Sequence, residues 1–174
     1  MDDRTPESGD SRLDQLQRLT VRMSDSMRTD IVLYHGAITQ RRLEGHFIGL
    51  CRALASAPNV LLVIATSASS ADAAQWMGRF LRESYEKVTV YADNSRGSTG
   101  ALLALGTDEL IIIDAETRAA LDPSAMARGP TAEEEEFLNS IRPLLHSLDD
   151  RFPSMYLKEM LEVLSDVSRK DPES

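Results

Sequence analysis

The sequence has one cysteine, few aromatic residues and no long apolar run. Cys51 is the only thiol among 174 residues, so an internal disulfide framework is excluded. No apolar run is long enough to span a bilayer, which argues against stable insertion into a membrane. The first residues, MDDRTPESGDSR, are acidic and polar, unlike a secretory signal. We therefore expect a soluble, cytoplasmic protein in which Cys51, on the apolar face of a predicted helix, is a buried thiol.

Positive charge and histidine are also scarce. The chain has 19 Lys and Arg against 28 Asp and Glu, a net charge of −9, so binding to nucleic acid is not expected. The three histidines, His35, His46 and His146, have no spacing that supports a metal site. No G-x-G-x-x-G motif follows the first predicted strand, so a nicotinamide cofactor is not indicated. We expect neither a metal ion nor a cofactor.

The apolar residues that are present are sufficient for one domain with a core. Hydrophobic residues make up 42% of the chain. Residues 1–11 are charged, lack apolar periodicity and are predicted to be disordered. A weak helical stripe covers residues 12–28, the main domain covers 29–128, and a helical extension covers 129–174.

In the main domain, strand patterns alternate with helix patterns. Strands are predicted at Asp30–Tyr34, Val60–Ala65, Val88–Ala92 and Glu109–Ile113. The helices between them are predicted at about Gln40–Ala57, at Ala71–Tyr85 with a capping pattern from Ser69 to Asp72, and after Ser98. The apolar run VLLVIA is typical of a strand buried on both faces of a parallel sheet. The alternation predicts an α/β fold with a mostly parallel sheet and flanking helices.

The extension carries two predicted helices. Thr131 begins the first with a capping box to Glu134, and Pro143 is predicted to kink it. We interpret the four glutamates Glu133–Glu136 as a solvated helix start, because no histidine lies at ligand spacing. The second helix is predicted from about Ser154 to Val167. These helices and the N-terminal stripe carry more apolar surface than one small domain needs, which predicts a homo-oligomer in which at least one of them contacts a neighbour.

The stretch NSRGSTGALLALGTDELIII, residues 94–113, joins the third strand to the fourth through a short helix. Ser98 lies at the start of that helix, where the backbone N–H groups favour negative charge. The residues alone leave two interpretations open: Ser98 is an N-cap, or it is a nucleophile. Ligands of parallel sheets bind beyond the carboxyl ends of the strands. The small-residue turns at Thr66–Ser70 and Asn94–Ser98 both fall there.

The segment Asp30–Pro123 resembles the Clp-protease-like branch of the crotonase superfamily, in particular the serine dehydrogenase proteinase and signal-peptide-peptidase-A group. The matching pieces are VLLVIATSASSADAA, KVTVYAD, GSTGALLALGTDELII and ALDP. In that group a serine followed by a small residue and a glycine is the nucleophile, and the matching residues here are Ser98, Thr99 and Gly100. The resemblance implies a Clp/crotonase-like fold and a serine hydrolase, in particular a peptidase acting on a peptide or protein. It also implies assembly into a trimer, hexamer or ring.

Two positions depart from the family pattern. The family places a glycine pair after the central strand, and the matching residues are Ala68 and Ser69. The candidate oxyanion donors are therefore the backbone N–H groups near Ala68, Ser69 and Thr99. Where Clp proteases carry a histidine, about two dozen residues after the serine, this chain has Asp122.

The resemblance therefore does not identify a general base in this chain. Asp122 and His35, which ends the first predicted strand, are the candidates for base or orienting group. For each of the three histidines, His35 included, we expect a hydrogen-bonded structural role ahead of a catalytic one. Two functions follow from the sequence: a serine hydrolase, or a catalytically silent member of the same fold that serves as a binding or assembly subunit.

Overall fold

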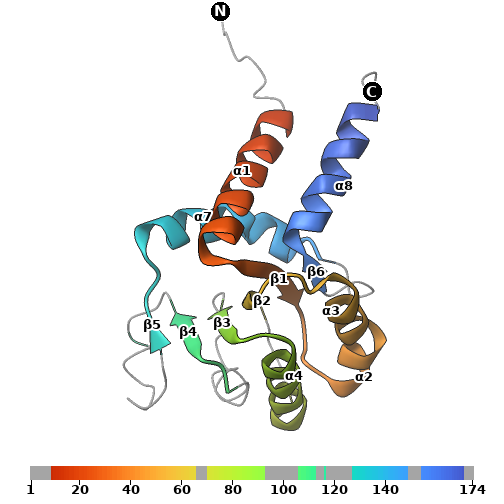
Figure 1. Ribbon diagram of the computed structural model, residues 1–174, viewed down its shortest axis with the longest axis vertical. Coiled ribbons are helices and arrows are strands. Elements are labelled where there is room, and N and C mark those ends of the chain that lie inside the picture. Colours follow the sequence, from red (N-terminus) through yellow and green to blue (C-terminus); the bar gives the residue numbers. More distant parts are fainter. Residues whose placement is uncertain are drawn as a thin grey trace, which may run out of the picture.

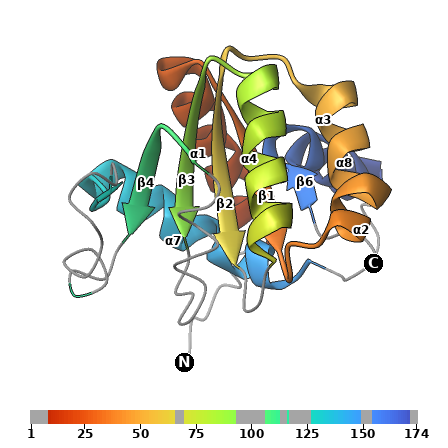
Figure 2. The same cartoon turned by 90° about the horizontal axis from the view of Figure 1, so that it is seen from below.

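In the computed structural model, residues 9–65, 70–92, 106–112, 116, 127–148 and 154–170 are described. They build a six-stranded sheet with helices on both faces (Figures 1 and 2). Along the sheet the order is β5-β4-β3-β2-β1-β6, and every pairing is parallel except that of β6 with β1. The strands are β1 (Thr29–His35), β2 (Asn59–Ala65), β3 (Lys87–Ala92), β4 (Glu109–Ile112), β5 (Ala127–Arg128) and β6 (Ser154–Tyr156). This confirms the predicted α/β architecture with a mostly parallel sheet.

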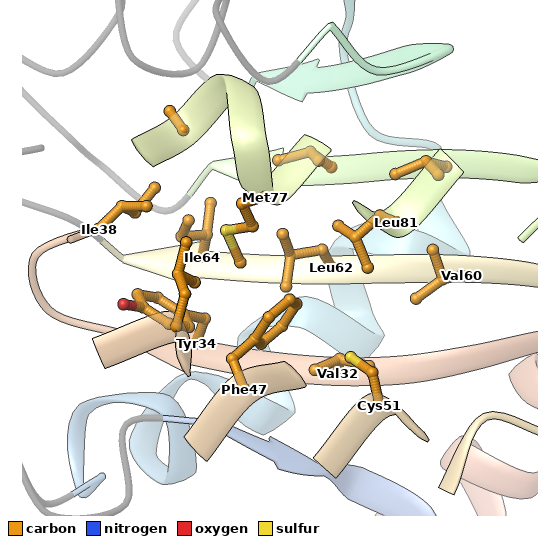
Figure 3. Close-up of a cluster of buried hydrophobic side chains, with 14 of the residues drawn as sticks. Val32, Tyr34, Ile38, Phe47, Cys51, Val60, Leu62, Ile64, Met77 and Leu81 are labelled. Carbon is orange, nitrogen blue, oxygen red and sulfur yellow. The ribbon is translucent and has the colours of Figure 1, made fainter. Parts of the chain in front are cut away.

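The first face of the sheet is covered by the helices that connect β1 to β2 and β2 to β3. They are α2 (Gln40–Arg42), the π-helix η1 (Leu43–Phe47), α3 (Ile48–Leu54) and α4 (Ala71–Ser84). Figure 3 shows their apolar side chains against those of β1 and β2, and the rings of Tyr34 and Phe47 meet edge to face at 6.0 Å between centroids. Cys51 is buried in this cluster, as predicted.

Two details of these helices differ from the prediction. The helix predicted from Gln40 to Ala57 ends at Leu54 and contains a π-helical turn, which apolar spacing does not reveal. The N-cap of α4 is Ser70, not Ser69, and its hydroxyl accepts a hydrogen bond from the backbone N–H of Ala73 at 3.3 Å. The predicted S-x-x-D pattern is therefore wrong by one residue, because the cap is set by which serine has extended backbone directly before the helix.

The second face is covered by α1 (Gly9–Met27), α7 (Ala132–His146) and α8 (Leu157–Lys170). Helix α1 begins at Gly9, within the segment predicted to be disordered, because packing of its apolar face stabilises a polar first turn. Residues 1–8 lie outside the described part of the chain. Residues Ser154–Tyr156, predicted to begin the last helix, instead pair with β1 as β6, so α8 begins at Leu157.

The start of α7 is held by an ion-pair network. The predicted capping box between Thr131 and Glu134 is present. Glu134 is not solvated, however: it is buried, and the Arg128 guanidinium donates to both of its carboxylate oxygens, at 2.9 and 3.0 Å. Arg128 also pairs with Glu109, which Lys87 contacts at 3.3 Å. Burial alone would raise the pKa of Glu134, but the bonds from Arg128 and Thr131 outweigh it and lower that pKa.

We expect Glu134→Gln to lower the free energy of unfolding by about 1–3 kcal/mol at pH 7, because the substitution removes a buried, charge-assisted pair. A carboxylate whose pKa is lowered by folding stabilises the protein above its unfolded pKa. That stabilisation is lost as the pH falls through the folded pKa. Urea unfolding of both proteins should therefore show a difference that shrinks below a pH of about 4. Glu135→Gln, an exposed neighbour, is the control, and equal losses for both variants would contradict the prediction.

Candidate active site at the carboxyl edge of the sheet

The carboxyl ends of β1 to β4 lie along one edge of the sheet. His35 is paired with Ala65, the last residue of β2, while Ala92 at the end of β3 is level with Ile64 and with Ile112. The four strands therefore end within one residue of each other, and Figure 2 shows the arrowheads of β2, β3 and β4 directed to the same side. In a parallel sheet this is the edge at which ligands bind.

Most of the predicted site residues lie outside the described part of the chain. Ala68 and Ser69 belong to residues 66–69, which follow β2, and Ser98 and Thr99 belong to residues 93–105, which follow β3. Asp122 belongs to the undescribed residues between β4 and β5. The structure therefore describes the strands from which these segments leave and one predicted site residue, His35.

His35 ends β1 on the face covered by α7. Gly36 follows it with φ of +104°, a conformation that favours glycine, and donates a backbone hydrogen bond to the carbonyl of Ala65 at 2.8 Å. The chain therefore turns away directly after His35, which leaves the imidazole partly exposed at the edge. The ring of His146 meets that of His35 edge to face, with 5.7 Å between centroids.

Helix α7 brings a second basic residue to the same end of the sheet. An Arg142 Nη atom donates to the hydroxyl of Tyr91 at 3.4 Å, and Tyr91 is a buried residue near the end of β3. Arg142 and His146 are four residues apart, so they lie on one side of α7. The spacing could have indicated that Arg142 and His146 lie on one side of the helix. It does not indicate that they contact Tyr91 and His35, because those contacts depend on how α7 packs on the sheet.

His46 contacts a serine, as a catalytic histidine does, but that serine is buried. Its Nδ1 lies 2.9 Å from the Oγ of Ser154, and burial lowers its pKa, so the neutral imidazole is favoured. Ser154 is only 2% exposed, which keeps its hydroxyl from a substrate. The contact instead links η1 to β6, in agreement with the structural role expected of His46.

A second polar cluster lies at the amino end of β1 and was not predicted. Asp30 is buried and accepts hydrogen bonds from the Ser56 and Ala57 backbone N–H groups, the Ser56 hydroxyl and the Tyr85 hydroxyl. The Tyr156 hydroxyl lies 2.6 Å from that of Tyr85. Beside this cluster, burial raises the pKa of Cys51 to about 11, so its thiol is protonated at neutral pH and is a poor nucleophile. The cluster joins β1, α4 and β6 rather than forming a reaction centre.

Within the described ranges, no three His, Cys, Asp or Glu side chains gather as a metal site. None of the helices in that part of the chain has the length and apolar character needed to cross a bilayer. Comparison of the chain with protein-family models, curated proteins and solved structures finds no match.

Proposed function

We propose that the protein is a serine hydrolase of the peptidase type, on a Clp/crotonase-like domain, with Ser98 as nucleophile. One observation supports this most: β1, β2 and β3 end at a common edge. His35 is at that edge, the segment carrying Ala68 and Ser69 follows β2, and the segment carrying Ser98 follows β3. A base, oxyanion donors and a nucleophile are thus contributed by three adjacent strand ends.

His35 is the base in this proposal. Strands β1 and β3 are two spacings apart, which is about 10 Å, whereas the six residues from Ala92 to Ser98 can span up to about 20 Å. Chain connectivity therefore allows the Ser98 hydroxyl to reach the imidazole. Asp122 is less well placed to orient His35, since its segment lies between β4 and β5, and β5 is four spacings from β1, about 19 Å.

The chemistry is acyl transfer. His35 takes the proton of the Ser98 hydroxyl as its oxygen attacks a peptide carbonyl, and the protonated imidazole then donates to the leaving amine. Backbone N–H groups near Ala68, Ser69 and Thr99 donate hydrogen bonds to the oxyanion that forms. The substrate class is a peptide or protein segment.

A fluorophosphonate probe tests the nucleophile. We expect weak covalent labelling of the natural protein, because Ala68 and Ser69 stand where glycines would leave the oxyanion donors unobstructed. Ser98→Ala should abolish the label, whereas Ser95→Ala, in the same segment, should retain it. Changing both Ala68 and Ser69 to glycine should strengthen labelling. Mass spectrometry of the labelled peptide measures the extent of labelling in the natural protein and in the three variants.

The second candidate function is a catalytically silent assembly subunit of the same fold. The exposed apolar residues of α8 favour it, because they offer a surface for another chain. Under this alternative Ser98 is only an N-cap, and Ser98→Ala costs about 1 kcal/mol of stability. Absence of label on both the natural protein and the double-glycine variant, with both folded, would select this function and reject the hydrolase.

A further inference from the structure

Helix α8 has apolar residues on its buried side and also on its exposed side. One side faces α1: the Ser165 hydroxyl donates to Gln17 Oε1 at 3.0 Å, and Leu161 is fully buried. A small hollow between the two helices is lined by Gln17, Thr20, Val21, Lys158, Leu161 and Glu162. Figure 1 shows α8 beside α1, both extending away from the sheet. Leu157, Leu161 and Ser165 are buried and thus define the side of α8 that the protein itself covers.

The exposed side carries an apolar stripe. At 100° per residue, Val163 and Val167 lie about 160° and 120° around the helix from the buried Leu161, and their exposed fractions are 61% and 59%. Leu164 lies between the two sides and is 39% exposed. Met160, which is half-buried and packs against the core of the second face, borders the stripe one turn earlier. The spacing 160, 163, 164, 167 is the i, i+3, i+4, i+7 pattern by which one helix packs against another. An apolar face of this kind is normally covered.

Among the described residues, no helix or strand covers Val163 and Val167, which remain mostly exposed. An exposed apolar stripe with helical spacing is suited to packing against a second apolar helix.

We propose that α8 packs antiparallel against α8 of a second copy of this protein. The stripe is symmetric about the midpoint between Val163 and Leu164. A two-fold axis at that midpoint places Val163 against Leu164 of the partner subunit and Met160 against Val167 of the partner subunit. A two-fold interface requires this self-complementarity of one patch.

The charges beside the stripe agree with the antiparallel arrangement. Glu159 in the first turn and Lys170 in the last turn lie on the same flank of the stripe. Antiparallel packing brings Glu159 near Lys170 of the partner subunit, and the two-fold axis repeats that pair. Parallel packing would bring the two Glu159 carboxylates to the same end of the interface.

The contact is small. A pair of helices of this length buries less than the roughly 800 Å² per partner of a standard interface, so we expect a dissociation constant in the micromolar range. The two-fold contact gives a dimer, and a hexamer or ring requires a second contact elsewhere. The proposal does not depend on Ser98 being catalytic.

Light scattering of the full chain over about 1–200 µM tests the interface. We expect the mass to rise from one chain to two, and Val163→Glu to keep the protein monomeric throughout because it places a charge in the stripe. Met27→Glu is the control, since Met27 is an exposed apolar residue of α1 outside both the stripe and the hollow, and this variant should still dimerise. A natural protein that is monomeric throughout, or one whose association is unchanged by Val163→Glu, would overturn the proposal.

Charge reversal distinguishes a second copy from any other partner and does not disturb the apolar residues. Glu159→Lys and Lys170→Glu should each raise the dissociation constant about twofold to fivefold, because each places like charges together. The double variant restores both pairs and should return to the natural value. If the double variant associates no better than the single ones, α8 does not pair antiparallel with itself.

Discussion

Replacing His35 with glutamine is expected to slow fluorophosphonate labelling of Ser98 by about 10²–10⁴-fold, the usual contribution of a general base. Glutamine retains hydrogen-bonding groups but cannot accept the serine proton at neutral pH. The imidazole is partly exposed at the end of β1, so the substitution leaves the core unchanged. The rate of label incorporation, followed by mass spectrometry at saturating probe, measures the effect.

His46→Gln is the matched control. His46 is also a partly exposed histidine, but it contacts the buried Ser154 on the other side of the sheet, so its loss should leave the labelling rate unchanged. If His35→Gln labels as fast as the natural protein while Ser98→Ala does not label at all, the base is a different residue. Asp122 would then be the next candidate.

Asp30→Ala is expected to lower the free energy of unfolding by about 2–3 kcal/mol. The carboxylate accepts from the Tyr85 hydroxyl at 2.8 Å, from the Ser56 N–H at 2.9 Å and from the Ser56 hydroxyl at 3.0 Å. The Ala57 N–H is a longer fourth donor at 3.3 Å. Tyr85 is buried, so its hydroxyl loses a partner that water does not readily replace, whereas Ser56 is exposed and its donors can bond to water. A hydrogen bond to a charged group contributes about 1.5–3 kcal/mol. Urea unfolding at pH 7 gives the value.

Asp72→Ala provides the comparison. Asp72 is an exposed carboxylate in the first turn of α4, where its interaction with the helix dipole contributes about 0.3–1 kcal/mol. The same chemical change should therefore cost several times less at Asp72 than at Asp30. Equal costs would show that the donors around Asp30 find other partners when the carboxylate is removed.

The strands that could be predicted are those in which the residues of the strand are themselves mostly apolar, because such a run indicates a buried strand. Residues Val60–Ala65 are apolar at every position because both faces of β2 are covered, and all six are buried. The short strands β5 and β6 have no such pattern. Ser154–Tyr156 is a strand only because the edge of β1 offers Val32–Tyr34 as a partner, which three residues of sequence cannot indicate.

Local sequence patterns predicted the position of the candidate site but not the contacts that its residues make. Parallel strands and small-residue turns locate the carboxyl edge, and the histidine that ends β1 falls there. The contact between His35 and His146, and the bond from Tyr85 to Asp30, join residues far apart in sequence with no shared pattern. Such contacts follow from how α7 and α4 dock on the sheet, which a single sequence does not encode in any short window.

The outer edge of β1 has a consequence for synthesis of the chain on the ribosome. β1 and α1 are translated well before β6, the antiparallel neighbour of β1, and α8, the helix that packs on α1. A nascent chain that stops before residue 154 therefore has an open sheet edge beside the buried strand β1 and an uncovered side on α1. Open edges of this kind pair with other strands and are bound by chaperones. Truncated chains should consequently aggregate or be degraded, whereas chains that extend through α8 close both surfaces in a single late step.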